Sequence, residues 1–90
     1  MNNAPHITPQ IWQRQVRPAL NDAGFNDQKL DRIEGFFSAY LNRADQLDRY
    51  PGIYADELDK TIGYMRENPD ATHFDSHEID LIDAELRRHL

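Results

Sequence analysis

The chain has 90 residues, no cysteine, an apolar fraction of 39%, and 16 acidic against 10 basic residues, for a net charge of −6. This length suffices for one small domain with a modest core. The lack of cysteine excludes a disulfide framework, a thiolate metal site and a thiol nucleophile. No apolar run reaches the roughly 18 residues of a membrane-spanning helix, and the polar first residues are not typical of a signal peptide. We therefore expect a cytoplasmic protein with no membrane partner.

The acidic residues are unevenly distributed along the chain. Residues 1–44 carry five basic and four acidic residues, a net charge of +1, whereas residues 45–90 carry five basic and twelve acidic residues, a net charge of −7. Such an acidic half repels the phosphates of nucleic acids, so we expect no nucleic-acid partner. A basic protein surface would be attracted instead.

A helix is predicted to begin near the N-terminus. Residues 1–7 are interpreted as a flexible tail, and residues 8–90 as a single helical domain. Thr8 is a good N-cap, and Pro9 would occupy the first helical position, where its missing N–H costs nothing.

The same helix contains a second proline and ends at a glycine. Pro18 removes one backbone hydrogen bond and clashes one turn back, so we expect a kink or a break near residues 14–17. Gly24 is predicted to end the helix as a left-handed C′ residue, followed by an apolar contact between Phe25 and Leu20.

The central helix is predicted from a wide apolar stripe within residues 29–47. Asn26 is its expected N-cap. Gly35 lies inside the helix at a cost of about 1 kcal/mol relative to alanine, and we interpret it as a point of close approach by a neighbouring backbone. The stripe consists of residues spaced by three or four positions, namely Leu30, Ile33, Phe36, Phe37, Tyr40, Leu41, Ala44 and Leu47.

Two further helices follow. A type II turn is predicted at residues 50–53, and a third helix from about residue 54 to residue 68, where Asn68-Pro69 stops it. Asp75 is predicted to cap the last helix, with Glu78 at N3 completing a capping box. The sequence thus predicts an all-α, compact four-helix domain with short connections.

An internal echo suggests a metal site as one alternative function. Segments around Glu57 and Glu78 align 21 residues apart, each with an apolar residue four positions before the glutamate, which is similar to the second half of an EF-hand calcium loop. The first half of that loop lacks its ligands in both copies. The echo is also explained without calcium, because each glutamate falls at N3 of a helix, where an acidic side chain is favourable.

A second metal candidate is the run His73, Asp75 and His77, which has ligand types suited to zinc but no evident fourth ligand. We expect no cofactor and no bound metal. A metal-responsive helical module, through calcium or zinc, is kept as the alternative function.

The aromatic residues favour protein binding over catalysis. No serine–histidine or thiol chemistry is evident, so no enzymatic activity is expected. Tyrosine, tryptophan and arginine are enriched at the most strongly contributing positions of protein interfaces. The alternative is that Trp12 and Tyr40 belong to the core. The candidate partner-binding residues are Trp12, Arg14, Arg17, Tyr40, Tyr50 and Tyr54.

The sequence is thus interpreted as a small acidic protein-binding module, one form of which is a regulator or inhibitor that masks a basic protein surface. In size and charge, though not in motif, it is similar to bacterial nuclease-immunity proteins. A homodimer through the first and central helices is also expected, because the central stripe is wider than one neighbouring helix can cover.

Overall fold

The computed structural model describes residues 4–44 and 49–90. It is mainly helical, with one small pair of strands, and the prediction of an all-α fold with four main helices is confirmed. None of the helices in these ranges has the length and apolar character needed to cross a membrane. The elements in chain order are β1 (His6–Ile7), α1 (Pro9–Ile11), a π-helical segment (Trp12–Val16), α2 (Arg17–Asp22), α3 (Asp27–Leu41), β2 (Ile53–Tyr54), α4 (Ala55–Glu67), α5 (Pro69–Thr72) and α6 (Ser76–Arg87).

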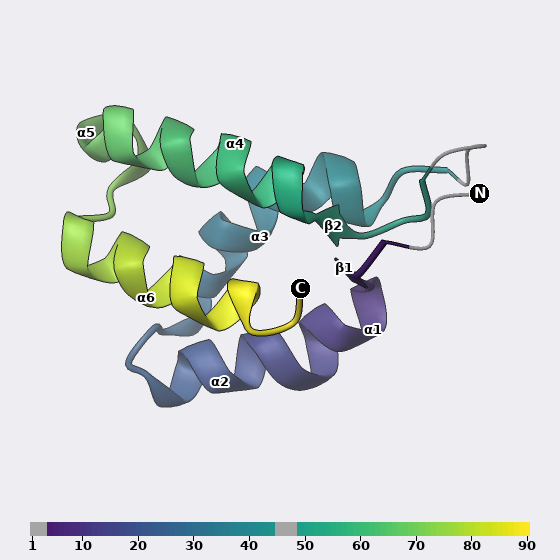
Figure 1. The fold of residues 1–90 in the computed structure, drawn as a ribbon. Coiled ribbons are helices and arrows are strands. Elements are labelled where there is room, and N and C mark those ends of the chain that lie inside the picture. Colours follow the sequence, from purple (N-terminus) through teal and green to yellow (C-terminus); the bar gives the residue numbers. More distant parts are fainter. Residues whose placement is uncertain (1–3, 45–48) are drawn as a thin grey trace.

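The helices surround one hydrophobic core. Figure 1 shows α4 above α6, with α3 behind them and α1 and α2 along the lower edge. Every helix longer than one turn sends buried apolar side chains into this core. Its largest members, all with no more than 2% of their surface exposed, include Trp12, Phe37, Phe74, Leu20, Leu30, Ile33, Leu58, Met65 and Ile79.

Before Pro18, where the sequence predicts a kink or a break, the first helix is wound more widely but is not broken. The Ile11 N–H donates to Thr8 Oγ1 over 3.1 Å, so Thr8 is the N-cap. The helix then becomes wider over the π-helical segment, and the Arg17 N–H donates to the Trp12 carbonyl five residues earlier. A wider turn makes room for the ring of Pro18, which would otherwise clash with a carbonyl one turn back. The helix is therefore modified without being interrupted.

The corner between α2 and α3 also forms as predicted. Gly24 has φ 111°, and the Phe25 N–H donates to the Leu20 carbonyl over 3.1 Å, which is the hydrogen bond of a Schellman motif. The Lys29 N–H then donates to Asn26 Oδ1 over 2.9 Å, so Asn26 is the N-cap of α3. Local hydrogen bonds fix this corner.

The central helix is shorter than predicted. α3 ends at Leu41, so Ala44 lies beyond the helix and is exposed, while Leu47 lies outside the described residues. Long-range contacts end the helix, because the carbonyl of Tyr40 accepts from the Gly52 N–H over 2.8 Å. The interpretation of Gly35 is also wrong, since a Cβ added there would meet nothing within 4 Å.

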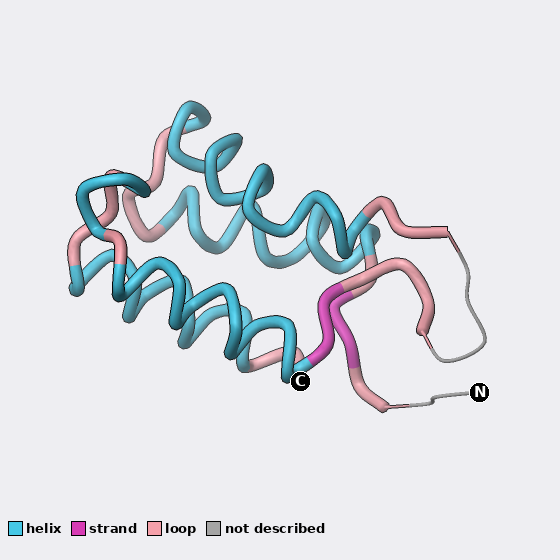
Figure 2. The backbone as a smooth tube through the Cα atoms, turned by 90° about the horizontal axis from the view of Figure 1, so that it is seen from above, coloured by secondary structure: helices cyan, strands magenta, loops and turns pink. Residues whose placement is uncertain are grey.

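An unpredicted pair of strands joins the two parts of the chain. β1 and β2 are antiparallel, with Ile7 opposite Ile53, and Figure 2 shows them side by side near the C-terminus. Ile7 is fully buried, so residues 6 and 7, which the sequence analysis assigned to the flexible tail, are part of the fold. Residues 1–3 of that tail lie outside the described residues.

Gly52 allows this strand pair to form. It has φ 141°, and a Cβ added at this position would lie 2.5 Å from the carbonyl oxygen of Ile7. That distance is shorter than any ordinary contact, and the atom concerned belongs to the backbone. The glycine predicted for a turn at residues 50–53 therefore serves mainly to let β1 approach.

Candidate interaction surfaces

A cluster of charged and aromatic residues lies where the strands meet α4, and we call this region the strand end. Glu57, at N3 of α4, accepts from the Tyr54 N–H over 3.0 Å and forms ion pairs with Arg43 and Arg49. Arg43 also donates to the Gly52 carbonyl over 2.6 Å. The side chains of Arg43 and Glu57 are only 14% and 11% exposed. The charged side chains of Arg43, Arg49 and Glu57 are therefore paired with one another within the chain.

Aromatic rings complete the strand end. Tyr54 is buried, and the imidazole of His6 stacks on it with ring centroids 4.5 Å apart. The guanidinium of Arg49 lies 4.8 Å from the Tyr54 ring centroid, in the range of a cation–π interaction. Arg49 also donates to both carboxylate oxygens of Asp56. The hydrogen bond from Arg49 lowers the pKa of Asp56 below its usual value.

A second polar cluster connects the first helix to α3. The Trp12 Nε1–H donates to Glu34 Oε1 over 2.6 Å. Arg17 donates to the same Glu34 oxygen over 3.1 Å and to Asp31 over 2.7 Å. Trp12 is buried with its one donor satisfied, so this cluster fixes α1 and α2 against α3 and leaves no tryptophan surface for a partner.

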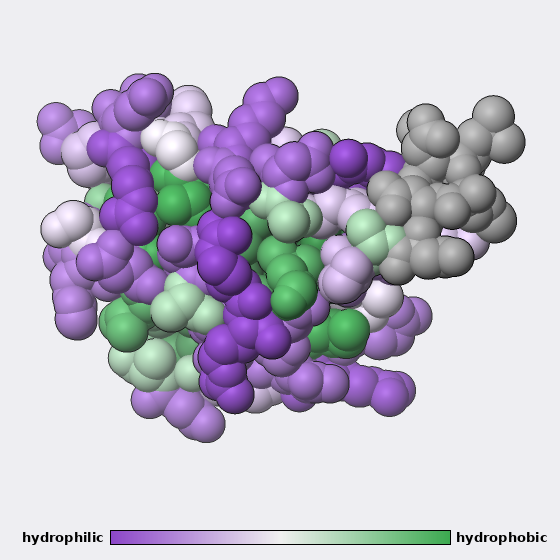
Figure 3. Space-filling model, viewed as in Figure 1, coloured by the Kyte–Doolittle hydropathy of each residue, from purple (hydrophilic) through white to green (hydrophobic). Residues whose placement is uncertain are grey.

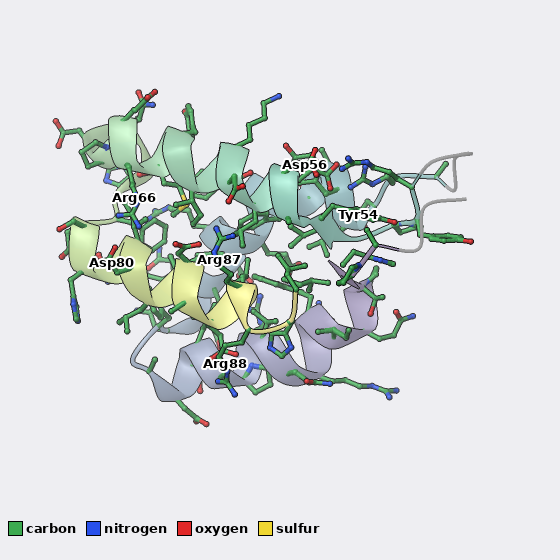
Figure 4. The ribbon with its side chains drawn as sticks, viewed as in Figure 1. Tyr54, Asp56, Arg66, Asp80, Arg87 and Arg88 are labelled. Atoms are coloured by element: carbon green, nitrogen blue, oxygen red, sulfur yellow. The ribbon has the colours of Figure 1, made fainter. Side chains whose placement is uncertain are left out.

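Ion pairs also cross the face formed by α4 and α6. Arg66 lies 2.9 Å from Asp80, and Arg87 lies 2.8 Å from Asp59. Figure 4 shows Arg66 of α4 and Arg87 of α6 between the two helices, with Asp80 beside Arg66. Hydrophilic residues cover much of this face (Figure 3). Asp83, four residues before Arg87, accepts from it over 2.9 Å. Each exposed pair contributes little stability, about 0–1 kcal/mol, but it neutralises an acidic side chain.

The remaining acidic residues gather at one end of the molecule. Of the ten acidic residues described after position 48, seven form ion pairs. The other three lie at the corner between α4, α5 and α6. The corner between α2 and α3, which has two more unpaired acidic residues, is at the same end (Figure 1). We call this region the acidic end; within the described ranges, its carboxylates without a cationic partner are Asp22, Asp27, Glu67, Asp70 and Asp75.

The two corners of the acidic end contact each other. The rings of Phe25 and Phe74 lie 6.2 Å apart between centroids, and Lys29 Nζ lies 2.5 Å from Glu78 Oε2. An open hollow of about 390 Å³ lies beside them on the surface, lined by Pro69, Asp70, His73, Phe74, Asp75 and Glu78.

The structure separates the predicted partner-binding residues into two groups. Trp12 and Arg17 share the carboxylate of Glu34, with Arg14 exposed nearby on the first helix. The second group belongs to the strand end, where Arg43 lies 5.4 Å from the ring of Tyr40 and 5.5 Å from that of Tyr54.

Burial leaves little side-chain surface on several of these residues for contact with a partner. Trp12 and Tyr54 are no more than 2% exposed, so neither presents a side-chain surface. Tyr40 and Tyr50 are half-buried, and the phenolic oxygen of Tyr54 accepts from the Tyr50 N–H over 3.1 Å. The sequence reasoning missed Arg43, although the N3 position of its partner Glu57 was recognised.

Both glutamates of the internal echo lie at N3 of a helix and accept from the N–H of the N-cap residue, and Glu78 completes a capping box with Asp75. The Tyr54 N–H donates to Glu57, and the Asp75 N–H donates to Glu78 over 3.1 Å. This confirms the capping explanation of the echo. Asp75, the middle residue of the second metal candidate, accepts from the Glu78 N–H over 2.8 Å. Within residues 4–44 and 49–90, no three histidine or carboxylate side chains are grouped as metal ligands.

Comparisons of the chain with protein-family models, with curated proteins and with solved structures gave no significant match.

Proposed function

We propose that this chain is a non-enzymatic protein-binding module whose acidic end binds a basic surface on a protein partner. Masking that surface would make the chain a regulator or inhibitor of the partner. The proposal concerns the acidic end as defined above, together with the hollow beside Phe74.

One observation carries the proposal: the carboxylates that lack an internal cation are concentrated at one end of the molecule. A carboxylate already paired inside the chain, such as Asp59 or Asp80, must give up its partner before it can bind another cation. Asp27 and Asp70 have no such partner among the described residues. A basic surface therefore gains most at the acidic end, and electrostatic complementarity also speeds its approach.

The hollow beside Phe74 supports the same choice of surface. Its wall includes the exposed Pro69 and the carboxylates of Asp70 and Asp75, neither of which has a cationic partner among the described residues. Lysine and arginine side chains have an apolar stem and a charged head. Such a side chain could place its stem against Pro69 and its head between the two carboxylates.

A binding role also fits the way in which the other carboxylates are used. Glu57 is engaged in a helix cap and two ion pairs, and Glu34 accepts from Trp12 and Arg17. These arrangements stabilise the fold. They differ from an acid–base pair aimed into an enclosed cleft.

The experiment uses a synthetic peptide rich in lysine and arginine as a probe, titrated calorimetrically into the wild-type chain at low and at higher salt. The double variant Asp27→Asn/Asp70→Asn removes two charges from the acidic end. We expect its affinity to be about tenfold lower, because each such contact contributes up to about 1 kcal/mol.

The matched control is Asp59→Asn/Asp80→Asn, which removes two charges from the ion-paired α4–α6 face. It should bind the peptide almost as tightly as the wild type. An equal loss of affinity in both double variants would show that only net charge matters, and would contradict the proposed site. The absence of salt-dependent binding by the wild type would contradict the proposed function.

A further inference from the structure

A second surface lies between α3 and α4, away from the ion pairs of the α4–α6 face. It is a groove of about 250 Å³, which we call the aromatic groove, and Phe36, Tyr40, Lys60, Thr61 and Tyr64 line it. Phe36 and Tyr40 pack partly against the core.

Tyr64 is the most unusual residue of the aromatic groove. Its residue surface is 51% exposed, and it is the only large hydrophobic residue classed as exposed in the described parts of the chain. An exposed aromatic residue beside an apolar groove is typical of a surface that another molecule covers.

Two charged residues flank Tyr64 on the same helix. Lys60 precedes it by four positions and Glu67 follows it by three, so the three side chains lie within about 60° around the axis of α4. Lys60 and Glu67 are exposed, and neither has an ion pair or side-chain hydrogen bond within residues 4–44 and 49–90. One cation and one anion thus lie on either side of the exposed ring.

We propose that two copies of this chain associate through α4, antiparallel across a two-fold axis between residues 63 and 64. This arrangement is self-complementary, because an axis at the midpoint of Lys60 and Glu67 places each lysine opposite the glutamate of the other copy. The two Tyr64 side chains then meet beside the aromatic grooves. The occupant of this surface is therefore a second copy of the chain.

Antiparallel packing also separates the charges that would oppose association. The acidic end lies at the C-terminal end of α4 (Figure 1), so the acidic ends of the two copies point in opposite directions and repel each other least. The interface differs from the one expected from sequence, since Trp12 is buried within a single chain. It uses Glu67, one carboxylate of the acidic end, and leaves Asp27 and Asp70 exposed, so the two carboxylates that test the proposed function lie outside this interface.

A charge-swap series measured by sedimentation equilibrium tests the proposal. Lys60→Glu would place two glutamates opposite each other at both ends of the interface, and Glu67→Lys would do the same with lysines. We expect each single variant to dimerise about tenfold more weakly than the wild type. The double variant Lys60→Glu/Glu67→Lys restores opposite charges and should recover most of the affinity.

The matched control for Lys60→Glu is Arg14→Glu, which makes the same change in net charge on the first helix and should leave the dimer unchanged. Tyr64→Ser should weaken the dimer, while circular dichroism should show an unaltered helix content in every variant. A wild type that remains monomeric at tens of micromolar overturns the proposal. A dimer insensitive to the swaps, or one disrupted by Arg14→Glu, also overturns it. Loss of peptide binding by the acidic-end variants would not affect this result.

Discussion

The strand end and the acidic end contain similar residues in different arrangements. At the strand end, Glu57 accepts from the N–H of the N-cap residue Tyr54, pairs with two arginines and is nearly buried. At the acidic end, Glu78 occupies the same N3 position in its helix but pairs with one partly exposed lysine, Lys29, and its neighbour Asp75 has no cationic partner among the described residues. The same local motif is therefore structural at one end and accessible at the other.

The comparison shows that tertiary partners, and not the capping motif, decide what a charged residue does. Arg43 and Arg49 reach Glu57 from the segment between α3 and β2, so long-range folding neutralises the strand end. Fewer cations reach the acidic end. Its charge is therefore left for solvent or for a partner, which is the basis of the proposed function.

The largest expected difference between the ends concerns the two N3 glutamates. Glu57→Ala would leave Arg43 partly buried without its carboxylate, and breaking such a pair costs about 3 kcal/mol. Glu78→Ala loses a cap and a more exposed ion pair, which together contribute about 1 kcal/mol. Urea unfolding of both variants, followed by circular dichroism, gives the two free energies of unfolding.

Glu57→Gln serves as the control for shape, because it can still accept from the Tyr54 N–H but lacks the charge. We expect its loss of stability to lie between those of the two alanine variants. Equal losses for Glu57→Ala and Glu78→Ala would remove the distinction between the two ends.

The two glycines with positive φ provide the next comparison. Gly52→Ala at the strand end places a Cβ against the Ile7 carbonyl, so β1 must move, and we expect a loss of about 3 kcal/mol from the clash and the backbone strain. Gly24→Ala at the acidic end meets no neighbour within 4 Å and should cost about 1 kcal/mol from its backbone conformation alone.

Thermal unfolding of both glycine variants measures this difference, and hydrogen exchange at Ile7 and Ile53 shows whether β1 has separated from β2. If Gly52→Ala were no more destabilising than Gly24→Ala, the close approach of β1 to residue 52 would be contradicted.

The smallest expected effect concerns one exposed aspartate at each end. Arg49 lowers the pKa of Asp56, so the ionised carboxylate is favoured in the folded state. Its contribution to stability is present above the unfolded pKa, near 3.8, and is lost as the pH falls through the lower folded pKa. Asp56 is largely exposed, and solvent screening keeps this contribution below about 1 kcal/mol.

Asp56→Asn should therefore lower the melting temperature slightly at neutral pH and have no effect in strong acid. Asp70→Asn, which removes an unpaired charge from the acidic end, should leave the melting temperature unchanged or raise it slightly. Melting curves from pH 2 to pH 7 would distinguish the two variants. A larger destabilisation from Asp70→Asn would show that its carboxylate has an internal partner.

Much of the helical framework was predictable because its signals are local. The N-caps Thr8, Asn26 and Asp75 each accept from a backbone N–H three residues later, and the Schellman contact of Phe25 spans only five residues. Interactions of this range depend on residue type and spacing, which are read directly from the chain. The apolar stripes of α3, α4 and α6 follow from helical periodicity for the same reason.

The candidate surfaces were less predictable. Tyrosine and tryptophan are common both in cores and at interfaces, so composition could not separate the buried Trp12 and Tyr54 from the exposed Tyr64. The prediction of an acidic second half did not show which carboxylates were already paired. That required the positions of the arginines in space.

The sequence by itself determined where the four main helices begin, how the first corner turns and that the chain is all-α, because those features depend on contacts between residues at most five positions apart. Only the tertiary structure decided that Ile7 joins the core, that α3 ends at Leu41 and that Glu57 is neutralised by Arg43. These features depend on segments brought together from distant parts of the chain. Their pairing is fixed by the geometry of the whole fold, which no local pattern specifies.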